Sequence, residues 1–132
     1  MAKFKLNMTH VHEHVEQAAL IQWAAFMAAK EPRLKLLNAS LNGVRLSPSQ
    51  SILAKKSGMK KGYPDLFLPV ATPSFHGLFI ELKRKDGNPS DVSKEQREWL
   101  ADLYGQNYKA LVCYGWEDAA QVISAYLGME DA

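Results

Sequence analysis

The spacing of apolar residues along the chain changes several times between a helical and an extended period. Apolar residues recur at helical spacing over residues 9–29, which predicts a long first helix. Thr9 is a suitable N-cap for this helix, and Pro32 would stop it. Proline at the first position of a helix is favourable, so Pro48 predicts a second helix over residues 48–57.

The second half of the chain contains two further helical segments. Ser93 and Gln96 form a capping-box pair, which predicts a third helix that ends near residue 105. A fourth helix is expected to begin at about residue 116. Short apolar runs predict strands at residues 34–37, 66–70, 78–83 and 109–114.

The order of these elements predicts an α/β fold with a central mixed sheet and helices on both faces. The short loop between the strands at residues 66–70 and 78–83 makes that pair antiparallel. The helix between the strands at residues 78–83 and 109–114 makes that pair a right-handed parallel crossover. We find no repeat and no linker, so residues 1–132 are expected to form one domain.

Composition excludes several classes of protein. A lone cysteine, Cys113, excludes a disulfide framework, and the cysteine and histidine pairs of a zinc site are missing. No apolar run is long enough to span a bilayer, and the first residues lack the apolar segment of a secretory signal. We therefore expect a cytoplasmic protein with no membrane partner and no small organic cofactor.

The net charge of +2 hides an uneven distribution. Residues 33–85 carry ten of the 16 basic residues and two acidic ones, whereas residues 86–132 carry three basic and nine acidic residues. A strongly basic segment within a compact domain is typical of a surface that binds polyanions, although solvated lysines would produce the same count.

The two acidic residues of the basic segment are Asp65 and Glu81. Side chains two apart on a strand point to the same face, so Glu81 and Lys83 project together, and Asp65 can face them from the neighbouring strand. Two carboxylates can hold a hard divalent cation, which polarises a phosphate oxygen and lowers the pKa of a bound water. The lysine can position that water and offset negative charge on the phosphate.

Three blocks of the sequence together resemble the VRR-NUC (virus-type replication-repair nuclease) family of the PD-(D/E)xK nuclease superfamily. These blocks are residues 62–67 (GYPDLF), residues 77–83 (GLFIELK) and residues 93–96 (SKEQ). The resemblance covers nearly the whole chain and implies a restriction-endonuclease-like core. It also implies Mg²⁺ or Mn²⁺ as cofactor, and DNA, as a branched four-way junction or flap, as partner.

The resemblance assigns roles to individual residues. It implies that Asp65 and Glu81 are metal-binding acids, that the carbonyl of Leu82 is a further metal ligand, and that Lys83 is catalytic. Gln96 resembles the glutamine that the family carries near the site, although a purely local role in the helix cap would also explain it. The family further places a glutamate of the first helix near the metal. We assign Glu16, with Glu13 as the alternative, because residues three apart share a helix face.

Basic residues flank these motifs and are predicted to contact phosphates without reading sequence. They are Lys55, Lys56, Lys60, Lys61, Arg84 and Lys85. We therefore predict a structure-selective DNA endonuclease that resembles stand-alone Holliday-junction resolvases and acts as a homodimer. A catalytically silent DNA-binding module and a sequence-specific restriction-type enzyme are the alternatives, and the intact Asp65, Glu81 and Lys83 set argues against the silent module.

Overall fold

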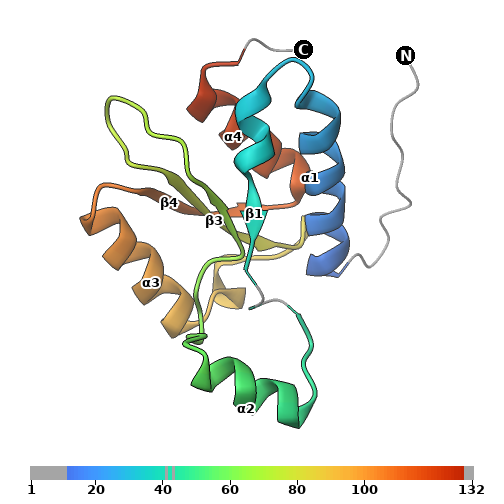
Figure 1. Cartoon of the computed structure of the whole chain (residues 1–132), viewed down its shortest axis with the longest axis vertical. Coiled ribbons are helices and arrows are strands. Elements are labelled where there is room, and N and C mark those ends of the chain that lie inside the picture. The colour runs from blue at the N-terminus through green and yellow to red at the C-terminus, as the bar shows by residue number, and fades with distance from the viewer. Residues whose placement is uncertain (1–11, 41, 43, 130–132) are drawn as a thin grey trace.

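The computed structural model describes residues 12–40, 42 and 44–129 (Figure 1). Four α-helices, two 3₁₀ helices and four strands follow one another along this part of the chain. In chain order they are α1 (Glu13–Met27), η1 (Pro32–Leu36), β1 (Asn38–Ala39), α2 (Pro48–Lys56), β2 (Leu66–Leu68), β3 (Leu78–Lys83), η2 (Pro89–Asp91), α3 (Lys94–Gly105), β4 (Lys109–Tyr114) and α4 (Trp116–Leu127).

The four strands form one mixed sheet in the order β1-β2-β3-β4. Strands β2 and β3 are antiparallel, with Leu66 opposite Ile80. Strands β3 and β4 are parallel, and they are joined through α3. Both predicted strand directions are therefore confirmed.

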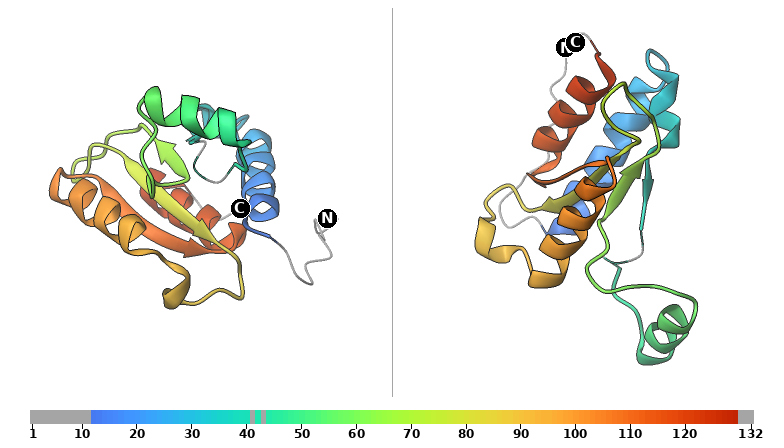
Figure 2. Two further views of the ribbon diagram at one scale, coloured as in Figure 1. Left: turned by 90° about the horizontal axis from the view of Figure 1, so that it is seen from below. Right: turned by 90° about the vertical axis from the view of Figure 1, so that its left-hand side faces the viewer.

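Helices cover both faces of this sheet, as the sequence predicts. Helices α1 and α4 lie on one face, whereas α3 lies on the other (Figures 1 and 2). Helix α2 stands apart at one end of the molecule, has no buried residue, and is joined to the sheet by its flanking loops.

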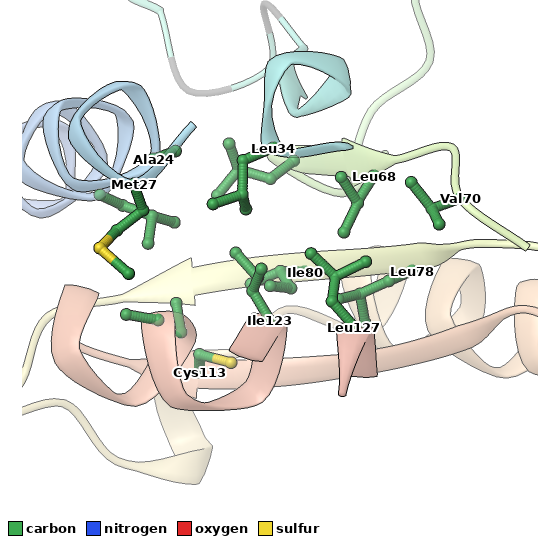
Figure 3. Close-up of a cluster of buried hydrophobic side chains, with 14 of the residues drawn as sticks. Ala24, Met27, Leu34, Leu68, Val70, Leu78, Ile80, Cys113, Ile123 and Leu127 are labelled. Atoms are coloured by element: carbon green, nitrogen blue, oxygen red, sulfur yellow. The ribbon is translucent and has the colours of Figure 1, made fainter. Parts of the chain in front are cut away.

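The hydrophobic core lies between the sheet and the helices α1 and α4 (Figure 3). Alternate residues of a strand point to opposite faces, so Leu78, Ile80 and Leu82 of β3 enter this core together. Leu20 of α1 and Ile123 of α4 meet them, and both are completely buried. The intervening residues of β3 point to the opposite face, and this places Glu81 and Lys83 outside the apolar core.

The prediction of a strand at residues 34–37 is wrong. Residues Pro32–Leu36 form the 3₁₀ helix η1, because the Glu31 side chain accepts a hydrogen bond from the backbone N–H of Arg33 and pairs with its guanidinium at 2.6 Å. Only Leu34 of the apolar run is buried, and Leu36 is 48% exposed. The first strand follows instead at Asn38–Ala39.

The other helices lie close to where the sequence predicts them. Helix α1 begins at Glu13 with His12 as N-cap, and Thr9, the predicted cap, lies outside the described residues. Helix α3 begins with the predicted capping box of Ser93 and Gln96. Strand β2 ends at Leu68, two residues before the predicted end, because Pro69 has no N–H group to donate. Among the described residues, no helix combines the length and apolar character that crossing a membrane requires.

Cys113 is packed in the core and is predicted to be unreactive in the folded protein. Its side chain is completely buried on β4, and burial raises the pKa of the thiol to about 12, with a further contribution from the nearby charge of Asp118. Since the thiolate is the reactive form, we expect no modification by a thiol reagent at pH 8 under native conditions, and stoichiometric modification in denaturant. Rapid labelling of the native protein would show that this strand opens or that the thiol is accessible.

Candidate functional site

Asp65 and Glu81 lie across from one another at the edge of the core. Leu66 pairs with Ile80, so the antiparallel register places Asp65, one residue earlier, opposite Glu81, one residue later. Both side chains are buried: Asp65 is 8% exposed and Glu81 is 2% exposed. Strand pairing therefore brings together two carboxyl groups that are 16 residues apart in the sequence.

The backbone holds Asp65 in place on both sides. Its Oδ2 atom accepts a hydrogen bond of 2.7 Å from the N–H of Leu82. Its own carbonyl accepts from the N–H of Ser40, and the carbonyl of Pro64 accepts from the Ser40 hydroxyl, both at 2.8 Å. Sequence reasoning missed Ser40, because a serine after a two-residue strand carries no recognisable signal.

The Leu82 carbonyl points toward the same edge of β3 as the Leu82 N–H. The N–H and C=O of a strand residue project to the same side, and the next residue projects to the other. The carbonyl of Lys83 accepts from the N–H of Gly115 on the β4 side, while the N–H of Leu82 reaches Asp65 on the β2 side. The Leu82 carbonyl is thus directed to the side on which Asp65 lies, as a metal ligand there would require.

Lys83 is buried beside these carboxyl groups. Its side chain is 6% exposed, and its Nζ atom lies 3.9 Å from Oε1 of Glu81 and 3.5 Å from Oε1 of Glu13. A lysine is rarely buried without acidic partners, and here two surround it. The structure therefore brings Asp65, Glu81 and Lys83 together, as their spacing on two strands predicts.

Gln96 makes both contacts that the sequence left as alternatives. Its carbonyl oxygen accepts a hydrogen bond from the N–H of Ser93 at 2.8 Å, which completes the cap of α3. Its amide nitrogen donates to Oε1 of Glu81 at 2.7 Å. The cap thus fixes the side chain that holds one oxygen of Glu81.

The two glutamates of α1 have different surroundings. Glu13 is half-exposed and lies beside Lys83, as described above. Glu16 is 1% exposed, and its two oxygens accept hydrogen bonds from the N–H groups of Lys85 and Trp116 at 3.0 and 3.1 Å. Glu16 therefore joins α1 to the end of β3 and the start of α4, while Glu13, the alternative in the sequence, faces the candidate site.

This difference predicts that replacing Glu16 affects stability, whereas replacing Glu13 affects the candidate site. Glu16→Ala leaves two backbone N–H groups without their charged acceptor, so we expect it to lower the free energy of unfolding by about 2–4 kcal/mol. Glu13→Ala is expected to change stability by less than about 0.5 kcal/mol and to weaken metal binding. Urea unfolding and metal titration of both variants check this. A destabilised Glu13→Ala variant beside an unaffected Glu16→Ala variant would reverse the assignment.

Burial makes the ionised forms of the two carboxyl groups unfavourable, even with Lys83 beside them. Burial, followed by the charge of Asp65, raises the pKa of Glu81 to about 9. Burial also raises the pKa of Asp65, although the hydrogen bond from Leu82 opposes this rise. Among the described residues, Oε2 of Glu81 is the buried side-chain atom that has no hydrogen-bond partner.

These features fit a divalent cation of the Mg²⁺ type. Within residues 12–40, 42 and 44–129, no three acidic, histidine or cysteine side chains cluster into a complete metal-binding set. Mg²⁺ is commonly held by one or two carboxylates and keeps several waters. Asp65 and Glu81, with the Leu82 carbonyl, match that requirement, and a cation would satisfy the unpaired oxygen of Glu81.

The predicted phosphate-binding residues are all exposed, but they do not form one cluster. Lys55, Lys56, Lys60 and Lys61 lie on or after α2, before Asp65, whereas Arg84 and Lys85 follow β3. Three of the six contact an acidic residue on the surface. These pairs are Lys61 with Glu95 at 3.8 Å, Arg84 with Asp86 at 3.7 Å, and Lys85 with Glu117 at 3.6 Å. Exposed pairs of this kind are weak, so the basic side chains are free to exchange them for phosphates.

The sequence profile of the VRR-NUC domain matches residues 4–117. The chain belongs to the VRR-NUC family. A solved structure described as a VRR_NUC domain protein superposes with a TM-score of 0.74 and 26% sequence identity, and the match covers 94% of each chain. A search of curated proteins found no match. The protein is therefore a VRR-NUC domain of α/β fold, and the family is of nuclease type, which implies binding to DNA.

Proposed function

We propose that this VRR-NUC domain is a divalent-metal-dependent endonuclease that hydrolyses phosphodiester bonds in branched DNA. The observation that carries this proposal is the cross-strand pair of buried carboxyl groups, Asp65 and Glu81, with Lys83 beside them. Burying two acids and a lysine together costs stability, and such groups are typical of functional sites. The membership of a nuclease family supports the same conclusion.

Asp65, Glu81 and the carbonyl of Leu82 would hold the cation, which we propose is Mg²⁺ or Mn²⁺. When bound, it would supply a Lewis acid for the phosphate and lower the pKa of a water molecule. We propose Glu13 as the acid of α1 that acts at this site, because Glu16 is committed to two backbone amides.

The other side chains of the site would orient the attacking water and the DNA and would neutralise negative charge on the phosphate. The Lys83 ammonium group would hold the attacking water and offset the charge that develops on the phosphate. Gln96 donates to Oε1 of Glu81, and Oε2 of that carboxyl group, which has no hydrogen-bond partner among the described residues, would be available to hold the cation. Lys56, Lys60, Lys61, Arg84 and Lys85 would hold the DNA backbone and contribute affinity that falls as salt concentration rises.

We further propose that the protein is a homodimer that cuts four-way junctions on two strands. A two-fold dimer places two equal sites on one substrate, as paired incision requires. Trp23 packs against the core, and Ala119, Ile123 and Leu127 of α4 are buried, so these apolar residues are largely unavailable to a partner. Phe26, which is 81% exposed on α1, leaves an apolar surface near Trp23 for a partner.

Substrate choice tests this part of the proposal. We expect the protein, with a chain mass of 14.8 kDa, to elute at about twice that mass. It should nick a four-way junction symmetrically and faster than a flap or a linear duplex, because the paired sites match the symmetry of the junction. Light scattering and a gel assay with each strand labelled measure both properties. Equal cutting of linear duplex, or a monomeric mass, would contradict a dimeric junction-cutting enzyme.

A further inference from the structure

A cavity of about 460 Å³ lies beside the candidate site, between the end of α2 and α3. Ala54 of α2 and Met59 of the following loop form one wall, and Tyr63 and Trp99 form another. Ser40 and Lys60 also line it. This volume falls in the range of pockets that bind small organic groups.

The aromatic wall of this cavity is held by the fold. The rings of Tyr63 and Trp99 meet edge to face with centroids 5.0 Å apart, and the indole N–H of Trp99 donates to the carbonyl of Lys61 at 3.1 Å. Gly62 lies against the start of α3 with a φ of 85°, and a Cβ atom there would come within 2.8 Å of the Glu95 backbone. The loop therefore sits directly on α3, and this contact fixes the two aromatic rings relative to one another.

Two residues that line the cavity, Tyr63 and Ser40, are close neighbours of Asp65. Tyr63 is two residues before Asp65, so their Cα atoms are at most about 7 Å apart. Ser40, which lines the cavity, also holds the carbonyls of Pro64 and Asp65. A group bound in the cavity would thus lie next to the segment that carries Asp65.

The charge around the cavity suits a nucleotide. Lys60 lines it, and Lys55, Lys56 and Lys61 are exposed on the same helix end and loop. A basic surface next to aromatic side chains is the combination that binds single-stranded nucleic acid, with phosphates on the lysines and bases on the rings.

We propose that this cavity binds an unpaired nucleobase of the DNA strand, next to the phosphodiester bond that is cut. The proposal rests on the proposed nuclease function and adds a reason for preferring branched DNA. A base that is already unpaired at a branch point enters the pocket without the cost of leaving a duplex, whereas a base within linear DNA must first be unstacked. Selectivity for branched DNA would then come in part from a pocket within each protomer, in addition to the pairing of two sites in a dimer.

Binding measured in EDTA tests the pocket separately from cleavage. Each unpaired nucleotide nearest the branch of a flap substrate is replaced in turn by an abasic residue, and the Kd is measured by fluorescence anisotropy. At one position we expect the abasic substitution to weaken binding about 5- to 100-fold, and Trp99→Ala to weaken binding of the intact flap similarly. The Kd of Trp99→Ala for the abasic flap should be within about twofold of the Kd measured with either change alone, because both changes remove the same contact. Additive effects, or no sensitive position, would overturn the proposal.

Variants of α2 provide a control that leaves the aromatic side chains in place. Ala54→Phe adds a ring to the cavity lining from α2, so it should weaken flap binding like Trp99→Ala and leave binding to linear duplex within about twofold. Leu53→Phe adds an aromatic ring at the neighbouring position, which is 66% exposed and does not line the cavity, and should change neither. If Ala54→Phe instead alters the oligomeric mass and spares flap binding, a second copy of the chain occupies the cavity and the proposal is wrong.

These outcomes are distinct from failure of the proposed function. If the protein cuts DNA but no abasic substitution in the unpaired strand weakens binding, the nuclease proposal stands and the nucleobase pocket is wrong. If the abasic and Trp99→Ala substitutions weaken binding as expected but the protein never cuts DNA, the pocket proposal stands and the nuclease proposal is wrong.

Discussion

Lys83→Met is expected to reduce the rate of DNA cleavage by about 10²- to 10⁴-fold at saturating metal and enzyme. The Lys83 ammonium group is buried beside Glu81 and contacts the half-exposed Glu13, and a methionine of similar length keeps the packing while it removes the charge. The loss should appear in the single-turnover rate and not in the Kd for DNA, because one buried ammonium group contributes little to phosphate binding.

Lys85→Met is the matched control for this substitution. Lys85 lies two residues further along the chain, is exposed, and pairs at the surface with Glu117. We expect the variant to bind DNA less tightly at low salt and to cut at the wild-type rate once it is saturated. Equal rates for Lys83→Met and wild type, or equal losses for both variants, would contradict a catalytic role that is specific to Lys83.

Divalent metal is expected to stabilise the protein strongly, because the folded chain brings the carboxyl groups of Asp65 and Glu81 together and the unfolded chain does not. At a metal concentration of about 100 times its Kd, the free energy of unfolding should rise by about 2.7 kcal/mol, and Tm by about 10 °C. A thermal melt in Mn²⁺ against EDTA measures the effect. Glu81→Gln should have a Tm close to that of wild type in EDTA and should show little of the increase in Tm that Mn²⁺ causes. Glu98→Gln, on the exposed side of α3, should show the full increase in Tm. A full rise in Glu81→Gln would place the metal elsewhere.

The raised pKa of Glu81 sets the sign of the pH dependence. A carboxyl group with a pKa of 4.5 when unfolded and about 9 when folded binds more protons in the folded state between these values. The stability of the metal-free protein should therefore be greatest below pH 4.5, as far as this group is concerned, and fall as pH rises toward about 9. Metal displaces the proton, so the stabilisation by metal should grow over the same interval. Glu81→Gln should flatten both trends in urea unfolding, and a slope that it leaves unchanged would assign the pH dependence to other groups.

The parts of the fold that the sequence predicts correctly are those with local causes. The capping box of Ser93 and Gln96, the proline at the start of α2 and the alternation of β3 all act within a few residues, and the structure confirms the elements that they predict. The segment at residues 34–37 has the apolar content of a strand, but the contact between Glu31 and Arg33 and the burial of Leu34 alone produce a 3₁₀ turn. Nothing in a short apolar run distinguishes these two outcomes.

The candidate site shows the same division. Asp65, Glu81 and Lys83 could be placed together because strand period and a short loop determine their faces, and β2 and β3 pair accordingly. Glu13 and Glu16 share a helix face, so their roles depend on how α1 is docked, and only the structure separates them. The contacts of Ser40 and of the Leu82 N–H with the Asp65 segment are made by the backbone or a common hydroxyl, and the sequence carries no trace of them.

Cleavage of a labelled four-way junction by wild type and by Glu81→Gln, each with Mn²⁺, Mg²⁺ or EDTA, measures directly whether Asp65 and Glu81 form the metal site of a nuclease. We expect wild type to cut with either metal and to be inactive in EDTA. We expect Glu81→Gln, folded and bound to the junction, to cut at least about 10²-fold more slowly. Cutting in EDTA, or a Glu81→Gln variant as active as wild type, would show that Asp65 and Glu81 do not form the metal site of a nuclease.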